Sequence, residues 1–229
     1  MSNKDKMAEG QSSLVTIVGS AYFHPISDLL VRLKALPSPT DDNQIKTGGI
    51  ENGYSAALCV VSVVCLESYL MRMRYTQQAV RNQTHNVLEV FCSVHADFTS
   101  LDELTEVYVI RDLLVHNHLW EIQYQWDESC PMDLVEAVRS FIKRDRKYER
   151  SVDLDNYQTK KLKLHIFPTR IDRHDAAKVL STVWNTLLYL ERCDRNQCYV
   201  SHMYVKKDGI SIKFGEVIKE FCTDTRTDP

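Results

Sequence analysis

The chain has 229 residues, of which 44% are hydrophobic and 26% are charged, and it carries a net charge of −3. These values are ordinary for a globular protein with a sizeable core, and they exclude a globally basic nucleic-acid-binding protein. Glycine (7) and proline (6) are scarce, which favours long helices over a turn-rich all-β fold. We expect a single domain over residues 14–229, after a disordered N-terminus at residues 1–13.

The first half of the chain predicts helices and one long loop, at residues 37–53, that is rich in helix breakers. Ser27 is the expected N-cap of the first helix, and Ser100 with Glu103 forms a capping box before the last one. The predicted helices are Ser27–Leu36, Tyr54–Tyr75, about Gln77–Phe98, and one that begins at Leu101. The second of these is strongly apolar, and we expect it at the centre of the core.

The second half mixes helices with strands. Proline at a first turn predicts a helix from about Pro131 to the end of "KRDRKYER", and alternating apolar residues predict a half-buried strand at Lys160–Phe167. A helix at Arg173–Arg192, a β-hairpin that turns near Asp208 and Gly209, and a helix at Gly215–Cys222 follow. The predicted fold class is therefore mainly α. It is a helical bundle with a core at about residues 54–150 and a small three-stranded β-sheet toward the C-terminus, at about residues 158–215.

Cysteine usage and hydropathy indicate a cytoplasmic protein. The seven cysteines include no CxxC pair, and His165, His202 and Cys198 match no zinc-ligand spacing, so we expect reduced thiols and neither a metal nor a cofactor. The N-terminus lacks the apolar run of a signal peptide. The most apolar stretch, residues 56–73, is interrupted by Glu67 and Arg72, which favours a core helix over a membrane span.

The segment "VIRDLLVHNHLWEI" (residues 109–122) places Arg111, Asp112, His116, Asn117 and His118 in an apolar stretch. On a helix, Arg111 and His116 are about 140° apart and can converge on a groove. Asp112 and His116 are four residues apart, close enough for the carboxylate to orient the imidazole. Imidazole carries protons near neutral pH, and guanidinium binds phosphate with two N–H groups. With the 2′-hydroxyl of RNA as the nucleophile, such a pair cleaves a phosphodiester without a metal.

This segment resembles the HEPN superfamily, whose signature is an arginine, four to six arbitrary residues and a histidine on a helix. "RDLLVH" fits with four intervening residues and "RDLLVHNH" fits with six. Asp112 stands at the polar position that often follows the arginine. The apolar stretch "LCVVSVVCLESYLMR" is similar to the helix that packs against the motif, with Glu67 as its acidic residue. The match covers residues 54–150.

The resemblance implies a metal-independent endoribonuclease that acts as a homodimer, with two copies of the motif lining one cleft. It implies a setting in toxin–antitoxin or antiviral defence, with an antitoxin or defence-system partner protein. Arg111 would bind the phosphate, His116 would act as general acid and base, and Asp112 would orient His116. Asn117, His118 and Glu67 would support the site. One subgroup has tyrosine where this chain has His118, so the choice between His116 and His118 as the main catalytic histidine stays open.

Other interpretations of these residues are also open. Arg111 and Asp112 can belong to surface ion pairs, Glu67 can pair with Arg72, and the domain can be a non-catalytic helical module that binds a partner or nucleic acid. A second match to the signature, Arg195–His202, spans a helix end and a strand and is set aside.

A basic stretch is either an RNA-binding face or a solvated helix end; its residues are Lys143, Arg144, Arg146 and Lys147. The aromatic residues that follow the motif are expected in the core or a dimer contact; they are Trp120, Tyr124 and Trp126.

Overall fold

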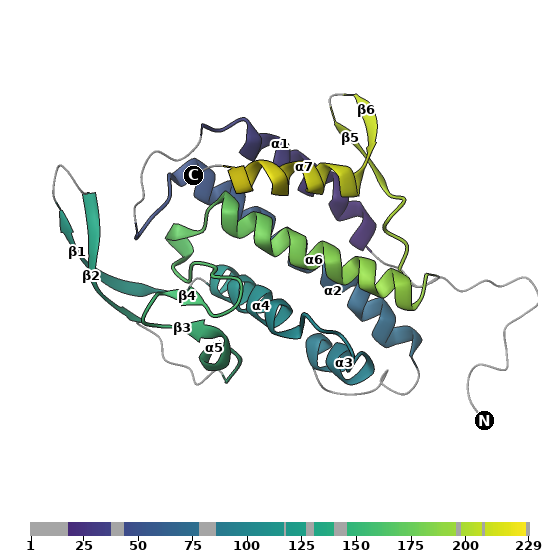
Figure 1. The fold of residues 1–229 in the computed structure, drawn as a ribbon, viewed down its shortest axis with the longest axis horizontal. Helices are drawn as coiled ribbons and strands as arrows, with labels where there is room; N and C mark the ends of the chain where they lie inside the picture. The colour runs from purple at the N-terminus through teal and green to yellow at the C-terminus, as the bar shows by residue number, and fades with distance from the viewer. Residues whose placement is uncertain are drawn as a thin grey trace, which may run out of the picture.

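The protein is mainly helical, with small antiparallel sheets of two strands each in the part of the chain that the structure describes (Figure 1). The computed structural model describes residues 18–37, 44–77, 86–116, 118–126, 131–139, 146–195, 198–207 and 209–227. The expected disorder at residues 1–13 lies outside these ranges. The helices are α1 (Phe23–Lys34), α2 (Gly49–Thr76), α3 (Val87–Val94), α4 (Leu101–Val115), α5 (Arg146–Ser151), α6 (Arg173–Cys193) and α7 (Phe214–Thr227), with 3-10 turns η1 (Gly19–Tyr22) and η2 (Pro168–Arg170). The strands are β1 (Trp120–Trp126), β2 (Pro131–Arg139), β3 (Val152–Asp153), β4 (Gln158–Thr159), β5 (Tyr204–Lys207) and β6 (Ile210–Lys213).

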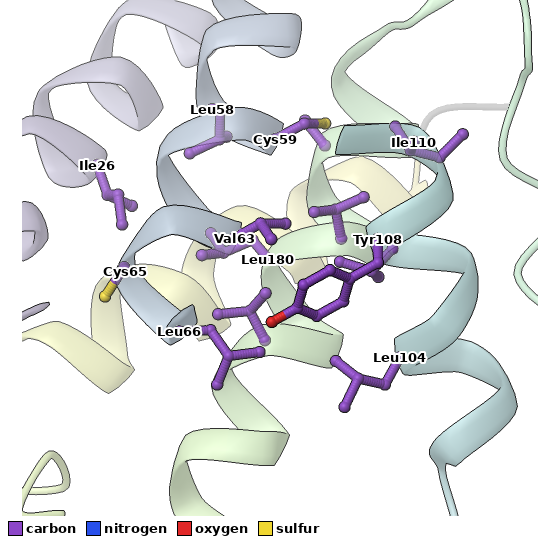
Figure 2. Close-up of a cluster of buried hydrophobic side chains, with 14 of the residues drawn as sticks. Ile26, Leu58, Cys59, Val63, Cys65, Leu66, Leu104, Tyr108, Ile110 and Leu180 are labelled. Atoms are coloured by element: carbon purple, nitrogen blue, oxygen red, sulfur yellow. The ribbon is translucent and has the colours of Figure 1, made fainter. Parts of the chain in front are cut away.

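The apolar helix α2 lies at the centre of the core, as predicted. It packs against α1, α3, α4 and α6. Figure 2 shows Leu58, Val63 and Leu66 of α2 among Ile26 of α1, Leu104 of α4 and Leu180 of α6. By length and composition alone α2 could cross a membrane, but half of its most apolar window is buried inside the protein. Contact with helices on several sides therefore accounts for its apolar sequence.

Helices α6 and α7 and the hairpin between them confirm the sequence predictions. The α6 helix begins at Arg173 behind a capping box formed by Asp172 and Asp175, and it buries one face along its length. Strands β5 and β6 pair antiparallel across Gly209, whose φ of +79° favours glycine at this turn. The last helix, α7, contains the predicted Gly215–Cys222 and extends beyond it at both ends.

The helix predicted from Pro131 is wrong, because residues 131–139 form β2, which pairs antiparallel with β1. Trp120 lies opposite Arg139 and Ile122 lies opposite Ala137, and this hairpin extends away from the helices (Figure 1). The sequence of β1, "WEIQYQW", alternates apolar and polar residues strictly, which is the period of a strand. Its partner "PMDLVEAVR" lacks a clear period, and pairing with β1 decides its conformation.

The strand predicted at Lys160–Phe167 is also wrong: this segment makes one isolated bridge, from His165 to Gln158. Several of its backbone N–H groups instead donate to side chains. The buried Glu106 carboxylate accepts hydrogen bonds from the backbone N–H groups of Lys161 (2.7 Å) and Leu162 (2.8 Å). The alternation predicted burial correctly, since Leu164 and Ile166 are buried. The three-stranded sheet is therefore replaced, among the described residues, by the separate pairs β1–β2, β3–β4 and β5–β6.

Several predicted helix boundaries also differ. Ser27 is buried inside α1, which continues from η1, so it is not an N-cap. Ser100 does precede α4 but forms no side-chain capping bond there, so the capping box is wrong. The α2 helix begins at Gly49 instead of Tyr54. In place of the long helix Gln77–Phe98, the structure describes α3, which has a capping box of Asn86 and Glu89; residues 78–85 lie outside the described ranges.

Candidate functional site

An ion pair between α2 and α4 forms the base of the candidate site. Arg111 Nη2 on the last turns of α4 lies 2.6 Å from Glu67 Oε1 on α2. The two side chains are 22% and 26% exposed, so both are partly withdrawn from water. Burial raises the pKa of the Glu67 carboxyl above its ordinary value, and the Arg111 charge offsets part of that rise. The carboxylate thus holds the guanidinium in one place at the surface of the helix pair.

The ion pair continues into a chain of alternating charges. Arg111 Nε lies 3.3 Å from Asp112 Oδ1, and the other oxygen of Asp112 accepts a short hydrogen bond from Lys147 Nζ of α5. Glu67, Arg111, Asp112 and Lys147 therefore form a row in which each charge faces an opposite one. Lys147, which the sequence predicts to bind RNA, joins α5 to α4 through this ion pair.

The ring of Tyr108 lies beneath these charges. It is buried and extends from α4 toward α2 (Figure 2). The Arg111 guanidinium lies 5.4 Å from the ring centroid and Lys147 Nζ lies 6.0 Å from it, so the ring face contacts both cations. Burial, and after it the charge of Glu67, raises the pKa of the phenol far above its ordinary value. Tyr108 is therefore a neutral support for the cations and takes no part in proton transfer near neutral pH.

Two imidazoles lie where α4 ends. His116 is the C-cap residue, exposed to solvent, and its backbone N–H donates to Asp112 O at 3.0 Å. His118 follows beyond the helix, and the centroids of the two rings are 6.4 Å apart with an interplanar angle of 29°. The expected Asp112–His116 side-chain pair is not formed, because the Asp112 carboxylate contacts Lys147 and Arg111 instead.

Sequence reasoning missed Arg139. Its Nη2 lies 2.8 Å from His118 Nδ1, and its guanidinium lies 4.1 Å from the ring centroid of Tyr148 in α5. Because an arginine can only donate, Nδ1 of His118 accepts, and the neutral imidazole carries its proton on Nε2. The β1–β2 hairpin places Arg139 beside His118. Because the sequence predicted a helix at residues 131–139, it did not predict this contact.

The predicted site residues thus form two groups: Glu67, Arg111 and Asp112 share one row of ion pairs, and His116 and His118 lie together where α4 ends. Arg146 lies exposed at the start of α5, beside Lys147. Three predicted residues, Asn117, Lys143 and Arg144, lie outside the described residues.

A second polar cluster, which the sequence did not single out, lies at the start of α6. One ligand-type atom from each of His165, Asp172 and Asp175 lies within 4.8 Å of the others, as a metal site would require. However, Asp172 accepts the N–H groups of His174 and Asp175, and Asp175 accepts from both the backbone and the ring of His165. These carboxylates are satisfied as a helix cap, so the cluster is structural.

Comparisons of the chain with protein-family models, with curated proteins and with solved structures found no match. The function is therefore argued from the residues at the end of α4.

Proposed function

We propose that this protein is a metal-independent endoribonuclease of the HEPN type that acts in the cytoplasm as a homodimer. The observation that carries the proposal is the 2.6 Å pair between Arg111 and Glu67, with the exposed His116 at the same end of α4. The resemblance in the sequence predicted each of these three residues, including an acidic residue on the preceding helix. A partner protein that restrains the nuclease, such as an antitoxin in a defence system, belongs to the same proposal.

The exposure and contacts of each side chain indicate its role in the proposed reaction. His116 is free to approach RNA, accept the 2′-hydroxyl proton and deliver a proton to the departing 5′ oxygen. The 2′ oxygen attacks the adjacent phosphorus, and the bond to the 5′ oxygen breaks, leaving a cyclic phosphate and a 5′-hydroxyl. Nη2 of Arg111 bonds to Glu67 and the buried Nε faces Asp112, so the Nη1 group is the one that can bind a phosphate oxygen as charge develops.

The surface next to these residues supports a second copy as the partner. Val115 and Leu119 flank His116 and are 51% and 60% exposed. Val138 of β2 is a further exposed apolar residue on the adjoining hairpin. Exposed apolar side chains grouped on one surface are typical of a protein–protein contact, and a homodimer would bring two copies of the motif together.

One observation favours a different function, in which the domain is a non-catalytic module that binds a partner or nucleic acid. Arg111 stands between Glu67 and Asp112, and Lys147 completes a row of balanced charges. A purely structural ion pair would have the same geometry. The two functions differ in what they require of Arg111, because a structural role needs its charge whereas phosphate binding needs its planar fork.

The variant Arg111→Lys separates the two functions. It keeps a positive charge facing Glu67 and removes the two-pronged contact with phosphate. We expect RNA cleavage in EDTA to fall by about 10- to 100-fold, the equivalent of losing one charge-assisted hydrogen bond in the transition state. The measurement is the rate of loss of full-length RNA, with Arg150→Lys, on the exposed side of α5, as the matched control. Wild-type rates in Arg111→Lys, or no cleavage by the unaltered protein, would favour the module.

A further inference from the structure

A large cleft lies along α6, away from the candidate nuclease site. Its volume is about 770 Å³, and its walls come from α6, from the segment that joins α3 to α4, and from the first turn of α4. In Figure 1 these three elements lie next to one another. Glu103 lines the cleft at the first turn of α4, whereas Arg111 lies about 12 Å and the C-cap residue His116 about 20 Å further along the axis of this 15-residue helix. The cleft is thus separate from the site described above.

Polar side chains form one stripe of α6 inside this cleft. Lys178, Ser181, Asn185 and Tyr189 follow one another at three- or four-residue spacing, so they share a helix face. This stripe is the solvent-facing side of an amphipathic helix, because the opposite face of α6 is buried against α2 and α7. Within the described residues, neither Ser181 nor Asn185 has a side-chain hydrogen bond, so both can donate to and accept from a ligand.

An aromatic pair stands at one end of the stripe. The ring centroids of Phe98 and Tyr189 are 4.8 Å apart, and both residues line the cleft. The Tyr189 hydroxyl donates to Asp97 Oδ1 at 2.8 Å, which fixes the ring. The Arg192 guanidinium lies 5.9 Å from the Tyr189 ring centroid. The Tyr189 ring already contacts Phe98 and Arg192, so an aromatic base would stack on the outer side of the exposed Arg192 guanidinium.

A cation stands at the other end of the stripe. Lys178 is exposed, with its Nζ 3.4 Å from Lys163 O, and the imidazole of His174 lies one helical turn before it. The Cα atoms of Lys178 and Tyr189 are about 16 Å apart along the helix, the length scale of an extended nucleotide. Two acidic residues, Asp97 and Glu103, also line the cleft. Asp97 is engaged by Tyr189, and Glu103 is a suitable acceptor for sugar hydroxyls.

We propose that the α6 cleft binds a nucleotide, with the base stacked on Arg192 beside Tyr189, the sugar beside Glu103 and Asn185, and the phosphates at Lys178. The combination of a stacking face, neutral hydrogen-bonding groups and a cation along one groove matches the three parts of that ligand. Binding here does not require the nuclease activity proposed above. A free nucleoside triphosphate and a nucleotide within single-stranded RNA both contain a base, a sugar and a phosphate. The experiment below distinguishes these two ligands.

The test is calorimetric titration of the full chain with ATP, GTP, CTP and UTP in turn, and with a short single-stranded RNA. Tripolyphosphate serves as the probe for simple attraction of anions. Lys178→Ala removes the phosphate contact, and we expect it to weaken binding about tenfold or more. Ser181→Leu fills the middle of the cleft and should abolish binding. Lys206→Ala, an exposed lysine on β5 outside the cleft, should leave binding unchanged.

Saturable binding that depends on Lys178 and Ser181 supports the proposal, and the ligand that shows it identifies the source as free nucleotide or RNA. Three results overturn it. The first is that none of the nucleotides and no RNA binds. The second is that tripolyphosphate binds as tightly as the nucleotides, because then no base is recognised. The third is that Arg111→Ala abolishes binding while Lys178→Ala and Ser181→Leu leave it intact, which places the ligand at the end of α4.

Discussion

The variant His116→Ala is expected to lower the rate of RNA cleavage by about 10²- to 10⁴-fold, the usual effect of removing a general acid or base. Its imidazole is exposed at the end of α4, where it can reach a substrate without any rearrangement of the core. Because its side chain is exposed and its one side-chain contact among the described residues is with the His118 ring, its loss should leave the free energy of unfolding nearly unchanged. The measurement pairs cleavage kinetics in EDTA with urea denaturation of the same protein.

His202→Ala is the matched control, because His202 is also an exposed histidine but lies after α6, far along the chain from the motif. It should cleave RNA at the wild-type rate. The variant His118→Ala decides which imidazole is the main proton carrier: a smaller loss than in His116→Ala assigns that role to His116. Full activity of His116→Ala would show that the cleavage arises elsewhere.

The variant Arg173→Met should give the largest loss of stability, about 3 to 5 kcal/mol of the free energy of unfolding. Arg173 Nε and Nη2 lie 2.9 Å from the two carboxylate oxygens of Glu51, and Nη2 also donates to Pro37 O at 2.8 Å. The side chains of Arg173 and Glu51 are 7% and 8% exposed. Removing the arginine leaves a buried carboxylate without its partner, and this pair joins the start of α2 to the start of α6. Chemical denaturation measures the change.

The double variant Glu51→Leu with Arg173→Met tests this cause. It removes both charges together, so it should be more stable than Arg173→Met alone. If the double variant is less stable than the single one, then lost packing, and not an unpaired carboxylate, explains the effect. The exposed pair of Lys34 and Glu220 offers a comparison, because Lys34→Met should change the stability by less than about 1 kcal/mol.

The sequence predicted those elements whose pattern is local. The α6 helix has a strong apolar stripe and an acidic residue at each end of its capping box, and its predicted start at Arg173 is confirmed. The turn at Gly209 is confirmed for a similar reason, and α4 does begin at Leu101 although the capping box that predicted this start does not form. In each case a few neighbouring residues favour one backbone conformation, so no distant contact is needed to decide it.

The elements that were predicted wrongly depend on partners far along the chain. Residues 131–139 have no clear period and become a strand because β1 pairs with them. Residues 160–167 alternate like a strand, yet the carboxylate of Glu106, 55 residues earlier, takes the N–H groups that a neighbouring strand would bind. Neither contact can be read from local spacing, because each joins segments that only the fold brings together.

The candidate site likewise contains some residues that the sequence predicted and others that only the fold brings to it. Spacing on one helix placed Arg111 and His116 at the same end of α4, and the resemblance added Glu67. The partner of Asp112 was not predictable, because Lys147 reaches it from α5. Arg139 and the cleft along α6 were missed, since both depend on how separate elements pack.

The most direct test of the central claim is an analysis of the ends of the RNA fragments that the unaltered protein produces in EDTA. The substrate is a short RNA, compared with the same RNA carrying a single 2′-deoxy nucleotide at the cleaved position. We predict fragments with a 5′-hydroxyl and a cyclic phosphate, and no cleavage at the 2′-deoxy position. Fragments with a 5′-phosphate, cleavage next to the 2′-deoxy nucleotide, or loss of all cleavage in EDTA would contradict a nuclease that uses the RNA's own hydroxyl and no metal.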